Sequence, residues 1–158
     1  MIILGIDPGY DRLGFAVISK NLGTKEVLLE SGCLTSEKKD DFADRLYTLG
    51  QKLENIFSHH RPNLLVIESL FVTKNQKTAM RVAEVRGLIL FLAGKYGTKV
   101  KEMSPPAIKL AVTGYGKADK NQVTTMAKLL INIPVAPKYD DEFDAIVIAL
   151  AGLTLPTK

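Results

Sequence analysis

The sequence predicts an α/β fold: a five-stranded mixed sheet, with three antiparallel strands followed by two parallel ones, and helices on both faces. Short apolar runs typical of strands come first, and three of them follow one another with only turns between. Further along, strand-like runs alternate with longer stretches whose apolar residues recur at helical spacing. Strands interspersed with helices in this way are typical of a mixed sheet covered on both sides.

The first three strands form an antiparallel meander. The first spans residues 1–7, where a short apolar run stops at Asp7 and the following Pro-Gly step forces a turn. Residues 12–19 and 26–35 also read as strands, and an Asn-Leu-Gly turn separates them. The first strand therefore ends directly on a carboxylate.

A helix and a central strand follow. In residues 40–59, apolar side chains recur at helical spacing with charged residues between them, and Pro62 marks the end of this amphipathic helix. Residues 64–67 are a continuous apolar run, typical of a central strand covered on both faces. This strand also ends on a carboxylate, that of Glu68.

The rest of the chain completes the sheet and adds helices. A Ser-Pro-Pro step at residues 104–106 is a helix-start signal, and a glycine-rich loop spans residues 113–118. No repeat, low-complexity tract or linker divides the sequence, so residues 1–158 are expected to form a single domain. The remaining predicted elements are a helix over about 77–95, a strand over 99–103, and helices over 107–112, about 119–131 and about 141–153.

Composition narrows the class of protein. With 46% hydrophobic and 24% charged residues, the chain has the composition of an ordinary soluble globular protein. The lone cysteine, Cys33, has no partner for an intrachain disulfide, and the sequence shows neither a signal peptide nor a long apolar run. A cytoplasmic protein without membrane association is therefore expected. Acidic residues gather at 140–144 while lysines dominate 95–120, and an acidic spot within a basic surface favours a nuclease over a plain DNA-binding protein.

Four carboxylates are the candidate functional residues. Asp7 and Glu68 lie at the carboxyl ends of two strands, where ligands bind in sheets of this kind. A carboxylate at the end of a central strand is costly to bury unless a cation or a hydrogen-bond donor compensates it. Asp141 and Asp144 are three residues apart on a predicted helix, so both project from one face.

This donor set indicates a hard cation. Oxygen ligands, without a cysteine cluster or a histidine pair at zinc spacing, select Mg²⁺, with Mn²⁺ as a substitute. Two such ions would activate a water and stabilise the leaving 3′ oxygen during phosphodiester hydrolysis. Taken singly, the acids have structural alternatives, with Asp7 as an Asx-turn residue and Asp140 or Asp141 as a helix N-cap. As a set they favour metal binding, because their like charges repel unless a cation joins them.

Four short segments, which together span almost the whole chain, form a recognisable set: GIDPG at 5–9, IESLF at 67–71, GYGKADK at 114–120 and DEFDA at 141–145. In their order and spacing they resemble the motifs of the RuvC family of bacterial Holliday junction resolvases. The resemblance implies the RNase H-like fold and two Mg²⁺ ions held by Asp7, Glu68, Asp141 and Asp144. It also implies a homodimer that resolves four-way DNA junctions by paired symmetric nicks in recombination and repair, with the RuvA and RuvB branch-migration complex as partner.

The resemblance also assigns roles to residues beyond the acids. Phe71 matches an aromatic residue that stacks on a base near the crossover, although alone it would be interpreted as a core phenylalanine. Lys109 and Lys120 match catalytic basic positions near the scissile phosphate, where an ammonium offsets developing charge. Alone, each would be interpreted as a solvated helix lysine. Independently of the family, four basic residues of the second helix and the preceding loop are candidates for phosphate contacts: Lys74, Lys77, Arg81 and Arg86.

Other residues carry narrower expectations. Glu142, an extra acid inside the last motif, either points to solvent or adds negative charge that a metal must offset. His59 and His60 are expected to be exposed at a helix end and not to act as ligands. Ala83 and Gly87 allow close approach of another backbone, and their helix is the expected dimer contact.

Two other functions stay open at this point. An RNase H-like nuclease with another substrate, such as RNA–DNA hybrids or flaps, would use the same metal site. A non-catalytic DNA-binding module of the same fold would keep its acids for structure and would show neither metal dependence nor cleavage. A kinase-like ATPase is disfavoured, because one domain of this size lacks the second lobe that closes over ATP.

Overall fold

The computed structural model describes residues 1–21, 23, 25–69 and 76–155, and within them five strands form one mixed sheet. The strands are β1 (Ile2–Asp7), β2 (Arg12–Ser19), β3 (Val27–Thr35), β4 (Leu64–Glu68) and β5 (Lys99–Met103). Their order in the sheet is β3-β2-β1-β4-β5. β1 pairs antiparallel with β2 and parallel with β4, while β2–β3 is antiparallel and β4–β5 parallel. The predicted mixed sheet is therefore confirmed.

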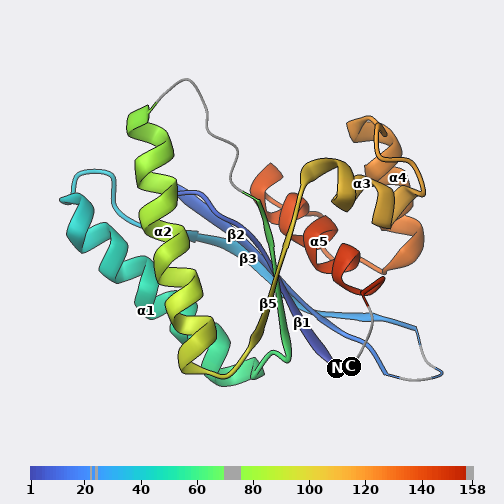
Figure 1. The fold of residues 1–158 in the computed structure, drawn as a ribbon, viewed down its shortest axis with the longest axis horizontal. Coiled ribbons are helices and arrows are strands. Elements are labelled where there is room, and N and C mark those ends of the chain that lie inside the picture. Colours follow the sequence, from blue (N-terminus) through green and yellow to red (C-terminus); the bar gives the residue numbers. More distant parts are fainter. Residues whose placement is uncertain (22, 24, 70–75, 156–158) are drawn as a thin grey trace.

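Helices cover both faces of the sheet, as predicted (Figure 1). α1 (Phe42–His60) and α2 (Gln76–Lys95) lie on one face. On the other face lie α3 (Pro105–Thr113), α4 (Lys120–Leu130) and α5 (Asp140–Gly152). The ends of these helices differ from the predicted ends by at most two residues, and the two apolar layers between sheet and helices form the core. No helix in the described part of the chain is both long enough and apolar enough to cross a membrane.

Contact between α5 and the sheet is unusually close, and two glycines allow it. A Cβ atom at Gly5 of β1 would collide with the backbone of Ala145 and Ala149. At Gly14 of β2, a Cβ atom would collide with the main-chain carbonyl of Asp141. The helix from Ala145 onward is buried along its length, so its first turn is fixed over the edge where β1 ends and β2 begins.

Candidate functional site

The sheet brings Asp7 and Glu68 to the same edge. β1 and β4 are parallel, and Ile6 lies opposite Ile67, so the next residue on each strand is an acid. Both acids are half-buried. Their placement at the carboxyl ends of strands is the one predicted from the sequence, and the structure adds that the two strands are neighbours.

α5 adds two acids beside this pair. Asp7 is paired across the sheet with Gly14, and the carbonyl of Asp141 packs directly on Gly14. Asp141 is therefore held next to the end of β1, and Asp144 follows on the next turn of the helix. The close packing of α5 on two glycines thus sets the distance between the helix acids and the strand acids.

Asp140 and Asp141 do not cap α5, so that structural alternative is wrong. The N-cap residue is Tyr139, and it makes no side-chain capping bond. Asp140 instead accepts a hydrogen bond of 2.9 Å from Lys120 Nζ. Asp141 Oδ2 accepts one of 2.8 Å from Arg12 Nε. Each of these acids is paired with a cationic side chain from another element.

Glu142 adopts neither of the two placements expected for it. Its carboxylate is half-buried and turned toward β3, where it accepts a hydrogen bond of 2.7 Å from Ser31 Oγ. It also accepts one of 3.1 Å from the backbone N–H of Lys138. This acid therefore ties the start of α5 to the sheet and does not join the other carboxylates.

Three of the four predicted metal ligands, Asp7, Glu68 and Asp144, have raised pKa values. The pKa of Asp7 is raised from 3.8 to about 7, first by burial and then by the charges of Asp144, Asp141 and Glu68. Burial and the charge of Asp144 raise the pKa of Glu68. The pKa of Asp144 is also raised, chiefly by partial burial, although Lys120 acts in the opposite direction. The four carboxylates thus form one electrostatic cluster with Asp7 at its centre.

The chemistry of this cluster fits a hard cation, although the side chains are spread apart. All four groups supply carboxylate oxygens, the ligands preferred by Mg²⁺ and Mn²⁺. Within the described residues, no three His, Cys, Asp or Glu side chains are grouped closely enough to hold a metal ion as they stand. Asp141 is turned toward Arg12, and repulsion acts between the other three. A bound cation would have to draw these carboxylates together.

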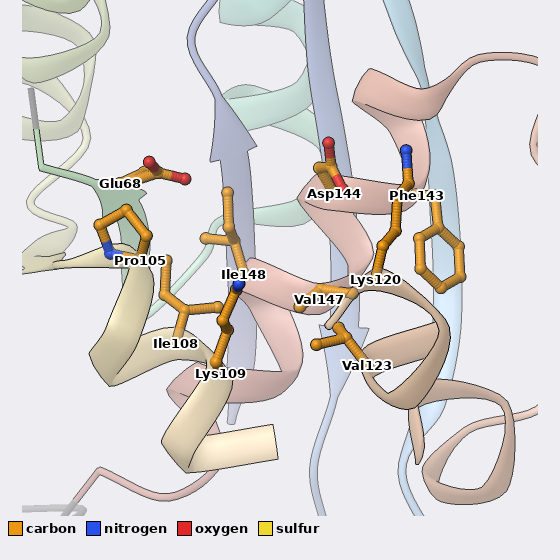
Figure 2. Close-up of a pocket in the computed structure, with 10 residues that line it drawn as sticks. All are labelled: Glu68, Pro105, Ile108, Lys109, Lys120, Val123, Phe143, Asp144, Val147 and Ile148. Carbon is orange, nitrogen blue, oxygen red and sulfur yellow. The ribbon is translucent and has the colours of Figure 1, made fainter. Parts of the chain in front are cut away.

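A pocket of about 260 Å³ lies beside the cluster, between α3, α4 and α5 (Figure 2). Glu68 and Asp144 lie at its upper edge, and Lys109 and Lys120 point toward that edge from α3 and α4. Its remaining lining is mainly apolar and comes from Pro105, Ile108, Val123, Phe143, Val147 and Ile148. The structure therefore places both predicted lysines near two of the predicted acids.

Comparison with known proteins decides the family. The family model for "Crossover junction endodeoxyribonuclease RuvC" matches residues 3–152. This chain belongs to the RuvC family. A RuvC from Caldanaerobacter subterraneus subsp. tengcongensis is 43% identical over 151 residues, which cover 95% of this chain and 90% of the relative. A RuvC from Ruminiclostridium cellulolyticum is 41% identical over 150 residues, with 95% and 90% covered.

Solved structures agree with this assignment. The structure of T. thermophilus RuvC in complex with Holliday junction substrate superposes with a TM-score of 0.88 at 26% identity, covering 96% of this chain and 92% of that one. The yeast mitochondrial Holliday junction resolvase superposes with a TM-score of 0.69 at 15% identity, covering 94% and 76%, and shows the shared fold alone. The predicted RuvC family and its RNase H-like fold are confirmed.

Arg86 differs most from its predicted role as a phosphate contact. Its guanidinium is buried, Nη1 donates a hydrogen bond of 3.0 Å to the main-chain carbonyl of Glu68, and Nη2 is paired with Glu102 of β5. A side chain enclosed in this way cannot reach a DNA backbone, so the prediction is wrong for Arg86. The sequence held a signal for burial, because Arg86 lies four residues after Val82 and three before Ile89, on the apolar side of α2.

Of the other predicted DNA contacts, the structure describes only the side chain of Arg81. Arg81 lies over the ring of Phe42, with 3.6 Å between its guanidinium carbon and the ring centroid, and is 3.6 Å from Glu84. Phe71 and Lys74 lie outside the described residues, as does the side chain of Lys77. These predictions therefore stay predictions.

Two further side chains show what the sequence does not reveal. His59 is exposed as expected, whereas the expectation is wrong for His60, whose ring is 11% exposed and lies 2.6 Å from Glu30 Oε2. Sequence reasoning also missed Arg12, the partner of Asp141. No local pattern marks that pair, because its members are far apart in the chain and the packing of α5 brings them together.

Proposed function

We propose that this protein is a structure-specific endonuclease that cuts four-way (Holliday) DNA junctions by paired symmetric nicks, in recombination and repair. The observation that carries the proposal is that β1, β4 and α5 bring the backbones of Asp7, Glu68, Asp141 and Asp144 to one edge of the sheet. There, burial and the charges of the other three acids raise the pKa of Asp7 to about 7. Such repulsion is costly without a cation. The substrate class comes from the family, whose members are named crossover junction endodeoxyribonucleases and include T. thermophilus RuvC in complex with Holliday junction substrate.

The four acids are proposed to hold two Mg²⁺ ions, for which Mn²⁺ substitutes. When bound, the ions supply an activated water and a counter-charge for the leaving 3′ oxygen. The contribution of the chain is to position the ligands. β1 and β4 fix the backbones of Asp7 and Glu68 side by side, and the packing of α5 on Gly14 fixes that of Asp141.

Lys109 and Lys120 are proposed to act on the scissile phosphate. Both extend from helices toward the edge of the pocket where Glu68 and Asp144 lie (Figure 2). An ammonium there would offset the negative charge that develops on the phosphate. Lys120 Nζ forms an ion pair with Asp140, and both side chains are exposed. Because water screens this pair, the lysine can exchange Asp140 for a phosphate at little cost in free energy.

A homodimer through α2 is also proposed. Met80, Ala83, Gly87 and Phe91 are exposed and recur at three- or four-residue spacing, so they form one stripe along the helix. Met80 and Phe91 are each 66% exposed, which favours a covering partner. A two-fold dimer would present its two active sites to opposing strands of a junction.

The remaining proposals come from the sequence. Phosphate contacts are proposed for Lys74, Lys77 and Arg81, and base stacking for Phe71. The proposed protein partners are RuvA and RuvB, and the proposed location is the cytoplasm.

The test is a comparison of substrates at equal concentration. A labelled four-way junction, a linear duplex, a flap and an RNA–DNA hybrid are incubated with the protein in Mg²⁺ and in EDTA. Paired nicks confined to the junction and present only with Mg²⁺ are expected. Metal-dependent cutting of another substrate in preference to the junction would support the nuclease activity but refute the proposed substrate. Binding without cleavage of any substrate would indicate a DNA-binding module.

A further inference from the structure

Arg86 is one of two polar residues buried among those that the structure describes, the other being Thr98. Burying a guanidinium is costly unless its donors are paired, so its partners reveal what it does. One partner is Glu102 on β5, and the other is the main-chain carbonyl of Glu68, the last residue of β4. One side chain of α2 therefore reaches the ends of two strands at the proposed metal site.

The peptide group that follows Glu68 is fixed on both sides. Its carbonyl oxygen accepts the hydrogen bond of 3.0 Å from Arg86 Nη1. Its N–H, which belongs to Ser69, donates a hydrogen bond of 2.9 Å to the carbonyl of Met103 on β5. Rotation of this peptide would turn the backbone from which the Glu68 carboxylate projects. Both bonds oppose that rotation.

General anchoring of α2 does not require an arginine. Val85 and Ile89, on either side of Arg86, are fully buried and already pack α2 against the sheet. An apolar residue of similar volume at position 86 would avoid the desolvation cost and often stabilises a fold as well. What an arginine adds is a planar fork that bonds two acceptors at once. Here the fork joins Glu102 to the backbone of a proposed metal ligand.

We propose that Arg86 is a positioning residue that sets metal affinity through the backbone of Glu68. Hydrogen-bond partners behind metal ligands typically change metal affinity or activity by about 10- to 100-fold when they are removed. Arg86 would act in this way through the main chain and without touching DNA or metal. The inference rests on the proposed nuclease function, because it concerns the metal held by Glu68.

The test compares Arg86→Lys, which keeps the charge and loses the fork, with Glu102→Gln, which keeps the bond to Glu68. Junction cleavage is measured against Mg²⁺ concentration, and Mn²⁺ binding to the DNA-free protein is measured by titration calorimetry. In Arg86→Lys, the Mg²⁺ midpoint and the Mn²⁺ dissociation constant are expected to rise about tenfold, and saturating metal should restore most of the rate. Glu102→Gln is expected to stay close to wild type in both.

Three outcomes would overturn the inference while leaving the nuclease intact. The first is an unchanged metal affinity in Arg86→Lys. The second is an Arg86→Lys variant whose maximum cleavage rate falls while its Mg²⁺ midpoint stays at the wild-type value. The third is an equal loss of metal affinity in Glu102→Gln, which would assign the effect to the α2–β5 ion pair. Reversible unfolding would also raise the apparent dissociation constant, because metal binds only the folded molecules. Both measurements are therefore made under conditions in which urea denaturation in EDTA shows wild type and both variants to be fully folded. A wild-type protein that cuts no junction in Mg²⁺ would instead refute the proposed function.

Discussion

Replacement of Asp7 by Asn is expected to stabilise the metal-free protein at alkaline pH. The pKa of Asp7 is raised in the folded protein from 3.8 to about 7, so the folded state holds this proton more tightly than the unfolded state does. The resulting stabilisation is complete below about pH 4 and is lost progressively as the pH rises to about 7. The raised pKa values of Glu68 and Asp144 act in the same direction.

The size of the effect follows from the pKa of Asp7. A difference of about three pKa units at 1.36 kcal/mol per unit gives a cost of about 4 kcal/mol for the ionised side chain at pH 8. An asparagine removes the charge and its repulsion, but its amide still has to leave water. We therefore expect Asp7→Asn to raise the free energy of unfolding at pH 8 by about 2 kcal/mol in EDTA.

Urea denaturation in EDTA at pH 5 and pH 8 measures this effect for both proteins. The wild type should lose stability between the two pH values, and the Asp7→Asn variant should lose less. Addition of Mg²⁺ at pH 8 should stabilise the wild type more than the variant, because a ligand that binds only the folded state adds more stability the more tightly it binds. A variant that is less stable than wild type at pH 8, or that shows the same pH dependence, would refute the reasoning.

Three further predictions concern residues around the site. Lys120→Ala should slow junction cleavage by about 100-fold without weakening junction binding. The control variant Lys128→Ala, on the same helix, should cleave at the wild-type rate. Equal cleavage rates for the two variants would contradict the role of Lys120. Phe91→Glu should be a monomer in analytical ultracentrifugation, where the wild type should be a dimer. Tyr47→Glu, at an equally exposed position on α1, should remain a dimer. A dimeric Phe91→Glu variant would exclude this face of α2 as the dimer contact. Ser31→Ala should lower the free energy of unfolding by about 1–2 kcal/mol, because Glu142 loses a hydrogen bond, and unchanged urea denaturation would exclude that contribution.

The sequence predicts well those features that depend on local pattern and strand direction. Asp7 and Glu68 end two apolar runs, and parallel pairing of those runs necessarily places both acids at one edge. The spacing of Asp141 and Asp144 likewise needs only the helical repeat. The four candidate metal ligands therefore follow from the amino-acid sequence and two simple geometric rules.

Long-range pairing is what the sequence does not provide. The Arg12–Asp141 pair and the Ser31–Glu142 bond both join the meander to a helix more than a hundred residues later, and no spacing rule connects them. Side-chain burial on α2 is also hard to predict. That helix has apolar residues on its exposed face as well as on its buried one, so composition does not distinguish the two faces, and the spacing of Arg86 from Val82 and Ile89 is the local signal for its burial.

The most direct test of the account is to assay junction binding and junction cleavage by wild type and Asp7→Asn side by side, in Mg²⁺ and in EDTA. The account predicts that both proteins bind the four-way junction with similar affinity and that only the wild type, and only in Mg²⁺, introduces paired nicks. Cleavage by Asp7→Asn at the wild-type rate, or wild-type cleavage that persists in EDTA, would contradict the claim that these carboxylates hold the catalytic metal.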